Sequence, residues 1–199
     1  MNRILEFVLV SMIASGVHAL ESPRITVAGG VAVPIGPSPF SDGWNRGGMF
    51  ALGASKDVSR RVAAGVEIGY HRFRFDDAGF AAAIRESFPS VNVGGNDLDV
   101  LAVGARVEIA LRAWGTTKPF VLAGAGYDRV TRTAARASGP SAALVRLTDF
   151  GANHFALWVG AGARTAISPA ASLFVDGSYH FGGGGDAARF VPIRLGVSF

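Results

Sequence analysis

The chain has 199 residues, 27 of them glycine, a formal net charge of +4 and no cysteine. This much glycine disfavours a helical protein, because a glycine inside a helix costs about 1 kcal/mol relative to alanine. The lack of cysteine excludes a disulfide scaffold, a thiol nucleophile and a cysteine-based metal site, and the scattered positive charges, with Arg60-Arg61 as the only basic pair of note, indicate no nucleic-acid partner.

Residues 1–19 are predicted to be a secretory signal peptide. Arg3 gives a positive start, residues 7–14 form a short apolar run, and residues 17–19 have small or apolar side chains at the cleavage-site positions. The run is too short to cross a bilayer, which takes about 20 residues. We expect the mature protein to start near Leu20 and to form one domain over 20–199; an uncleaved amino-terminal anchor is the alternative.

The rest of the chain is divided into short segments in which apolar side chains alternate with small or polar ones. Alternation is typical of strands, because successive side chains point to opposite faces of a sheet. Eight strands are predicted, over about 25–36, 47–56, 62–75, 98–111, 119–131, 153–167, 172–181 and 189–199. No apolar run is long enough for a membrane helix, and one short surface helix is expected over 78–89.

The connections between these segments alternate in length. Residues 57–61, 112–118 and 168–171 are short turns, whereas the connections over about 76–97 and 132–152 are long. Short turns at one end and longer loops at the other are typical of outer-membrane barrels, with the short turns in the periplasm.

Most segments have an apolar face opposite a face with ionisable side chains. In the third segment, for example, Val66, Ile68 and Tyr70 oppose Glu67 and His71. A membrane barrel has lipid outside and a polar lumen inside, which accounts for both faces. The predicted fold class is all-β, an eight-stranded antiparallel up-and-down transmembrane β-barrel; a soluble β-sandwich is the alternative.

The last segment alternates most regularly and ends the chain on an aromatic residue. Its apolar positions are Val191, Ile193, Leu195, Val197 and Phe199. This pattern resembles the carboxy-terminal assembly signal of bacterial outer-membrane barrels, which ends in phenylalanine with apolar residues at alternate positions before it. The resemblance implies that the barrel assembly machinery is a partner.

The three tyrosines of the chain fall at equivalent places. Tyr70, Tyr127 and Tyr179 each lie late in a predicted strand, on the outward face and before a loop. Tyrosine favours the membrane interface because its ring is apolar and its hydroxyl is polar. We expect these tyrosines at the outer interface, with Trp114 and Phe199 near the periplasmic one.

Taken together, these segments resemble the outer-membrane protein A type of eight-stranded barrel. The resemblance is carried by residues 50–55, 66–70, 119–127 and the last strand. It implies a bacterial outer-membrane location, with membrane lipid and lipopolysaccharide as partners. That family usually has a peptidoglycan-binding domain after the barrel; we expect none here, and its role is not carried over.

Nine ionisable side chains are predicted to face the lumen: Glu67, His71, Arg106, Glu108, Asp128, Arg164, Asp176, His180 and Arg194. An eight-stranded barrel is just wide enough for side chains to fill. Unpaired charges there would be costly, so we expect these groups to pair and to plug the lumen.

Four outward-facing arginines lie at or beyond the level of the tyrosines: Arg72, Arg74, Arg129 and Arg189. Arginine binds phosphate groups in a bidentate way. These residues are therefore candidates for contact with lipopolysaccharide phosphates, with ordinary placement at a wet rim as the alternative.

Catalytic and metal sites are weakly indicated. Ser178, His180 and Asp176 share one strand face, but lipid A deacylase barrels have their histidine before their serine and a nucleophile that faces lipid. His71, His154 and His180 lie on different strands without a metal-binding spacing, and the glycine run 182–186 lacks the lysine and helix of a phosphate-binding loop. We expect no enzyme, cofactor or metal.

The predicted function is that of a non-catalytic barrel that presents the loops 76–97 and 132–152 outside the cell. Such loops suit surface recognition because a rigid scaffold holds them, although the extracellular ligand is unknown. A role in envelope integrity is equally compatible with the sequence. A narrow porin-like channel is the second interpretation, and a lipid A-modifying hydrolase is the third.

Overall fold

The computed structural model describes residues 23–36, 40–79, 92–95, 97–133, 136–138, 150–183 and 188–199. The predicted signal peptide, 1–19, and most of the expected helix, 78–89, lie outside these ranges. Within them, no helix has the length and apolar character needed to cross a membrane.

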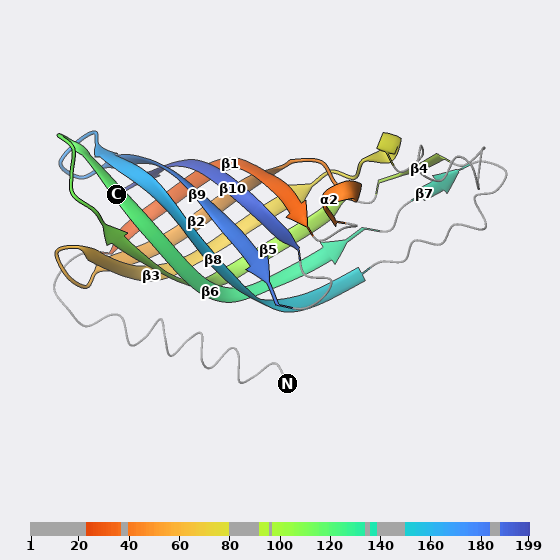
Figure 1. Cartoon of the computed structure of the whole chain (residues 1–199), viewed down its shortest axis with the longest axis horizontal. Coiled ribbons are helices and arrows are strands. Elements are labelled where there is room, and N and C mark those ends of the chain that lie inside the picture. The colour runs from red at the N-terminus through yellow and green to blue at the C-terminus, as the bar shows by residue number, and fades with distance from the viewer. Residues whose placement is uncertain are drawn as a thin grey trace.

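Eight strands close into a single antiparallel barrel (Figure 1). They are β1 (Arg24–Gly36), β2 (Gly47–Asp57), β3 (Val62–Phe73), β5 (Leu98–Ala110), β6 (Thr117–Arg132), β8 (Phe150–Ala166), β9 (Ser172–Gly182) and β10 (Arg189–Ser198). Each strand pairs with the barrel strand that follows it in the chain, and β10 returns to pair with β1. The predicted fold class is confirmed, with every strand end within three residues of its predicted place.

The first and last strands form the closing seam. Their ladder runs from Thr26 opposite Ser198 to Pro34 opposite Phe190, and Ile25 and Phe199 exchange two backbone hydrogen bonds of 3.0 and 2.9 Å beyond it. Closure leaves no strand with unpaired backbone groups along an edge, and this is what lipid requires of a spanning sheet.

The barrel has its apolar side chains on the outside. Ile68 and Leu195 are 51% and 57% exposed, whereas the ionisable Asp176 and Arg194 are 2% and 4% exposed. A soluble sandwich would show the opposite arrangement, with branched aliphatic side chains packed between two sheets. The chain is therefore built as a membrane-spanning barrel, with an outer apolar belt and an inner polar lumen.

The two ends of the barrel differ. At one end, residues 58–61, 111–116 and 167–171 form tight turns held by backbone hydrogen bonds such as Val58 N–H to Val62 C=O, 2.8 Å. The opposite end has the longer connections, and there the short helix α2 (Phe40–Gly43) packs against β1.

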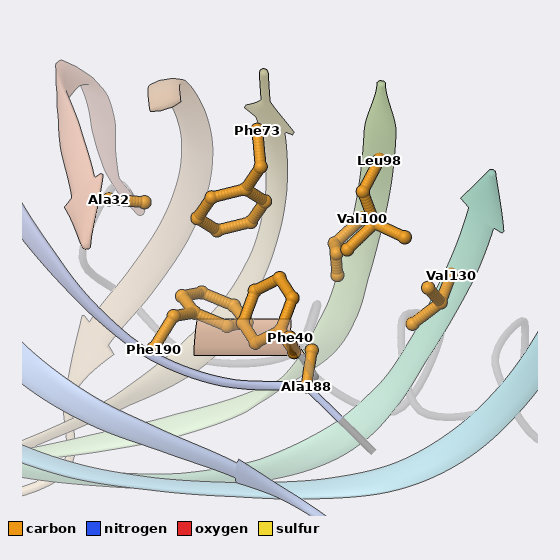
Figure 2. Close-up of a cluster of buried hydrophobic side chains, with 8 residues drawn as sticks. All are labelled: Ala32, Phe40, Phe73, Leu98, Val100, Val130, Ala188 and Phe190. Atoms are coloured by element: carbon orange, nitrogen blue, oxygen red, sulfur yellow. The ribbon is translucent and has the colours of Figure 1, made fainter. Parts of the chain in front are cut away.

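The end with the long connections is filled by an apolar cluster. Figure 2 shows its side chains converging around α2: Ala32, Phe40, Phe73, Leu98, Val100, Val130, Ala188 and Phe190. Phe40 packs edge-on against Phe73 with ring centroids 5.2 Å apart, and Phe73 packs in the same way on Phe190 at 5.4 Å. We call these eight residues the apolar plug, which was not predicted from the sequence.

A two-stranded ribbon projects beyond this end of the barrel (Figure 1). It consists of β4 (Asn92–Gly94) and β7 (Arg136–Ser138), which belong to the two long connections. Gly94 pairs with Arg136, and Leu98 pairs with Arg132, so the ribbon continues the register of the β5–β6 ladder. Thr133 spans the gap by donating its backbone N–H to Asp97 C=O, 3.2 Å. The parts of the two connections next to β5 and β6 therefore extend the barrel wall.

Glycines in the wall make room for a lumen tryptophan. A Cβ at Gly124 would meet the Trp158 ring at 2.1 Å, and one at Gly104 would meet it at 2.5 Å. Trp158 is only 3% exposed, so it has little free space to move into. Gly124 of the 119–127 motif is thus required for the packing of Trp158.

Gly124→Ala is expected to destabilise the folded barrel by about 1–3 kcal/mol, because the new methyl group overpacks against Trp158. Urea unfolding in lipid vesicles measures the change. The folded fraction is followed on gels by the difference in mobility between unheated and heated samples. Gly48→Ala is the matched control, because a Cβ at Gly48 meets nothing within 4 Å. Equal midpoints for the two variants would contradict the packing role of Gly124.

Candidate functional site: the lumen and its two rims

Six of the nine predicted lumen side chains form one connected set of ion pairs. Arg106 contacts Glu67, Glu108 and Asp176 at 2.8, 2.8 and 2.9 Å. Arg194 contacts Glu67 at 2.7 Å and Asp176 at 2.6 Å, and it donates a second hydrogen bond to Asp176 of 2.8 Å. Arg164 joins the set through Glu108, 2.9 Å. Three arginines thus offset three carboxylates; we call these six residues the lumen network.

The strands place this network because every member lies at an inward position. Arg194 pairs across the β10–β9 ladder with Asp176, and their side chains therefore leave the wall side by side. Arg106 and Glu108 are alternate residues of β5 and share its inner face. The inner face alone is enough to bring together residues up to 127 positions apart in the chain, as Glu67 and Arg194 are.

The other three predicted lumen residues also point inward but lie outside the network. His71 and His180 belong to an aromatic layer: both rings contact Phe190, at centroid distances of 4.7 and 4.8 Å, and His180 stacks on Trp158 at 5.1 Å. Asp128 is 3% exposed, and its Oδ1 has no hydrogen-bond partner in the described ranges. The expectation that every lumen charge pairs does not hold at Asp128.

The lumen is filled between the two ends. Two cavities that border Glu67 of the network have volumes of about 10 and 20 Å³. Each holds one water molecule at most, since about one probe sphere of space is needed per water. Network, aromatic layer and apolar plug follow one another along the axis. The described residues therefore leave no wide aqueous path.

The apolar plug was not predicted, although the sequence contains a pattern that indicates it. Phe73 and Phe190 have the same parity as the lumen charges, but they lie at the loop ends of their strands. Apolar residues on a polar parity, confined to one end, indicate a closed mouth. Phe40 carries no such signal, because it enters from a connection and not from a strand.

The four outward arginines occupy two regions of the rim. Arg72 lies on β3 and Arg129 on β6, with only β5 between them, and Arg74 directly follows β3. Arg189, on β10, is separated from β3 by β1 and β2, and from β6 by β9 and β8. All four are exposed. The four arginines therefore do not converge on a single phosphate group.

Arg72 already has acidic partners. It contacts Asp97 at 2.8 Å and Asp99 at 4.0 Å, and the Tyr70 hydroxyl donates a 2.7 Å hydrogen bond to Asp99. These acids on the neighbouring connection and strand reduce the positive charge available to a ligand. Arg129 has no ion pair in the described part of the chain.

The interfacial and closing residues point outward. Tyr70, Tyr127 and Tyr179 are 41%, 51% and 39% exposed, and Trp114 at the opposite end is 75% exposed. Ile193, Leu195 and Phe199 of the last strand are exposed, whereas Val191 and Val197 are half-buried.

The triad arrangement is not formed. Asp176 accepts hydrogen bonds from Arg106 and Arg194, and His180 stacks between Trp158 and Phe190. Among the described residues, no hydrogen bond joins Ser178 to His180, whose Nδ1 has no partner. Nothing here orients the histidine as a base, as a triad needs. Nor do the described ranges contain three His, Asp or Glu side chains placed to hold a metal ion.

Comparison with solved structures gives the fold. Neisserial surface protein A matches with a TM-score of 0.58 and 16% identity, over 88% of this chain and 94% of that one. A major outer-membrane protein of Thermus thermophilus matches at 0.54 and 16%, over 90% and 99%, and the amino-terminal β-barrel domain of Pseudomonas aeruginosa OprF at 0.50 and 9%, over 90% and 98%. The chain has the fold of the small outer-membrane barrels. No protein-family model matches it, and no curated protein matches it by sequence.

Asp176→Asn is expected to destabilise the barrel by about 3–5 kcal/mol, because it leaves two buried arginines short of a carboxylate. Urea unfolding in vesicles measures the effect. Asp57→Asn is the control, since Asp57 is 50% exposed and contacts only Arg24; the expected change there is below about 1 kcal/mol. If both variants unfold at the same urea concentration, the ion pairs of the lumen network do not contribute to the stability of the barrel.

Proposed function

We propose that this protein is a non-catalytic barrel of the bacterial outer membrane that presents its extended end to the outside of the cell. The filled lumen carries the proposal, because lumen network, aromatic layer and apolar plug occupy the path that a pore would need. The projecting β4–β7 ribbon adds a paired surface beyond the barrel wall on which recognition residues can sit. Support of envelope integrity is a second role compatible with the same structure.

The location and orientation rest on two supports. The outward apolar belt needs lipid, and the fold is shared with barrels that are outer-membrane proteins. Short turns face the periplasm in such barrels, and the longer loops face the outside. The ribbon then lies outside the cell, and the turns 58–61, 111–116 and 167–171 lie in the periplasm.

We further propose that the last strand is the assembly signal read by the barrel assembly machinery. Ile193, Leu195 and Phe199 leave an apolar face toward lipid, and the strand forms one half of the closing seam. A strand that must be placed last to close the barrel is a suitable point for recognition.

The narrow channel is the alternative function, and conductance separates the two. The wild-type protein, reconstituted into a planar bilayer after its heat-dependent gel shift has been verified, is expected to show no current steps on the nanosiemens scale. The physical reason is the filled lumen, whose inner cavities admit single waters only. Reproducible nanosiemens steps would refute the plugged barrel and favour the channel.

Lipopolysaccharide is the proposed outer-leaflet partner, with Arg72, Arg74 and Arg129 as one contact region and Arg189 as another. The exposure of these arginines at the extended end supports contact with phosphate groups. Because Arg72 is paired with Asp97, Arg129 is expected to carry the larger part of the first region.

Replacing Arg72, Arg74, Arg129 and Arg189 by alanine is expected to lower the lipopolysaccharide that co-purifies with the protein to less than about half, since charge-assisted contacts to phosphate are lost. Quantification of lipid A per barrel measures this. Arg112→Ala, which removes an exposed arginine at the opposite end, is the control for charge loss. If the quadruple variant retains the wild-type amount, the contact is excluded.

A further inference from the structure

The end of the barrel with the tight turns is hollow, in contrast to the plugged end. A cavity of about 200 Å³ opens into the lumen there, lined by inward residues of seven strands and by the turn 58–61. It is an order of magnitude larger than the cavities deeper in the lumen. We call it the periplasmic basin. It has room for a small ligand with several waters, since water occupies about 30 Å³ in the liquid.

The lining of the basin is strongly cationic. Its positive side chains are Arg24, Arg60, Arg61, Lys118 and Arg164, and its only acids are Asp57 and Glu108. Both acids are already engaged, Asp57 by Arg24 at 2.7 Å and Glu108 by two arginines of the lumen network. Arg60, Arg61 and Lys118 have no ion pair in the described part of the chain. Concave walls of low dielectric concentrate the field of these three charges.

Two of the cations are placed against each other. Lys118 of β6 lies directly opposite Arg164 of β8 in the ladder, and both side chains point inward. Like charges directly opposite each other across two strands destabilise a sheet. Glu108 offsets the charge of Arg164 at 2.9 Å, whereas Lys118 has no ion pair in the described ranges. Lys118 is therefore the side chain of this pair whose charge a bound anion would offset.

The turn that carries Arg60 and Arg61 is held in place. The Ser59 hydroxyl accepts backbone hydrogen bonds from Arg61, 3.4 Å, and Val62, 3.2 Å. The Arg61 carbonyl in turn accepts a 2.7 Å hydrogen bond from the Ala110 backbone N–H, which ties the turn to the end of β5. Fixed positions lower the ordering cost when a ligand binds.

We infer that the periplasmic basin binds a phosphate group, held between Lys118 and the turn arginines Arg60 and Arg61. A multiply charged, compact oxyanion suits a small basin with cations on several sides, and arginine provides paired donors to its oxygens. The group can arrive as free phosphate or as the headgroup of an inner-leaflet phospholipid. The inference concerns the end opposite the proposed recognition surface, so its failure leaves the proposed function untouched.

The test is isothermal titration of the full barrel, refolded in an uncharged detergent at low salt, because salt screens exposed charges. One arm uses inorganic phosphate, and the other uses dihexanoyl phosphatidylglycerol below its micelle concentration. The wild type is expected to bind at least one probe. Arg61→Gln/Lys118→Gln is expected to bind about tenfold more weakly, a loss in the range of two surface charge contacts.

Arg46→Gln/Arg112→Gln is the matched control, because it removes two exposed arginines that do not line the basin. It is expected to bind with wild-type affinity. Should the basin variant lose its heat-dependent gel shift, the single pair Lys118→Gln and Arg112→Gln replaces it. The arm that responds identifies the source of the phosphate group. No binding of either probe to wild type, or equal binding by the basin variant, would overturn the inference.

Discussion

The pairing of β1 with β10 is the interaction on which the rest of the structure depends. In lipid, a backbone N–H or C=O without a protein partner cannot form a hydrogen bond with water instead. A spanning sheet must therefore leave no open edge. The seam joins residues near both ends of the described chain, from Ile25 to Phe199. Once it is formed, the choice of face for every side chain follows. One parity meets lipid, and the other is enclosed.

Enclosure explains the chemistry of the lumen. Eight strands leave little room, and charged groups there must find partners among themselves. Arg106 shows how this is met, since one guanidinium serves three carboxylates that come from β3, β5 and β9. A buried network of this kind adds little net stability compared with apolar packing, but it makes each member hard to remove. It selects one arrangement of the barrel interior.

Much of this could be predicted because strands have a simple period. Alternation in residues such as Val66–Tyr70 identifies a strand and assigns each side chain to a face, and with eight strands the inward residues share one narrow lumen. The pairing within the lumen could not be predicted, since it depends on the stagger between strands. Stagger also sets Lys118 opposite Arg164.

The parts that were missed come from the connections. Phe40 reaches the plug from a segment with no period, and β4 and β7 are too short to stand out from a loop. Asp128 differs in kind: its inward direction follows from parity, but whether a partner within the described ranges reaches its Oδ1 depends on the neighbouring side chains. Long-range packing decides such cases.

The in-register ribbon also has a mechanical consequence. From Leu98 back to Asn92 there are six residues, which at about 3.3 Å per residue place the Asn92–Ser138 pair about 20 Å from the end of β5. Because the ladder keeps one register, a pull on this pair is transmitted as tension along β5 and β6, and not taken up by a slack tether. Force applied to this ribbon loads the barrel wall itself, where continuous hydrogen bonding on both sides of each strand shares it.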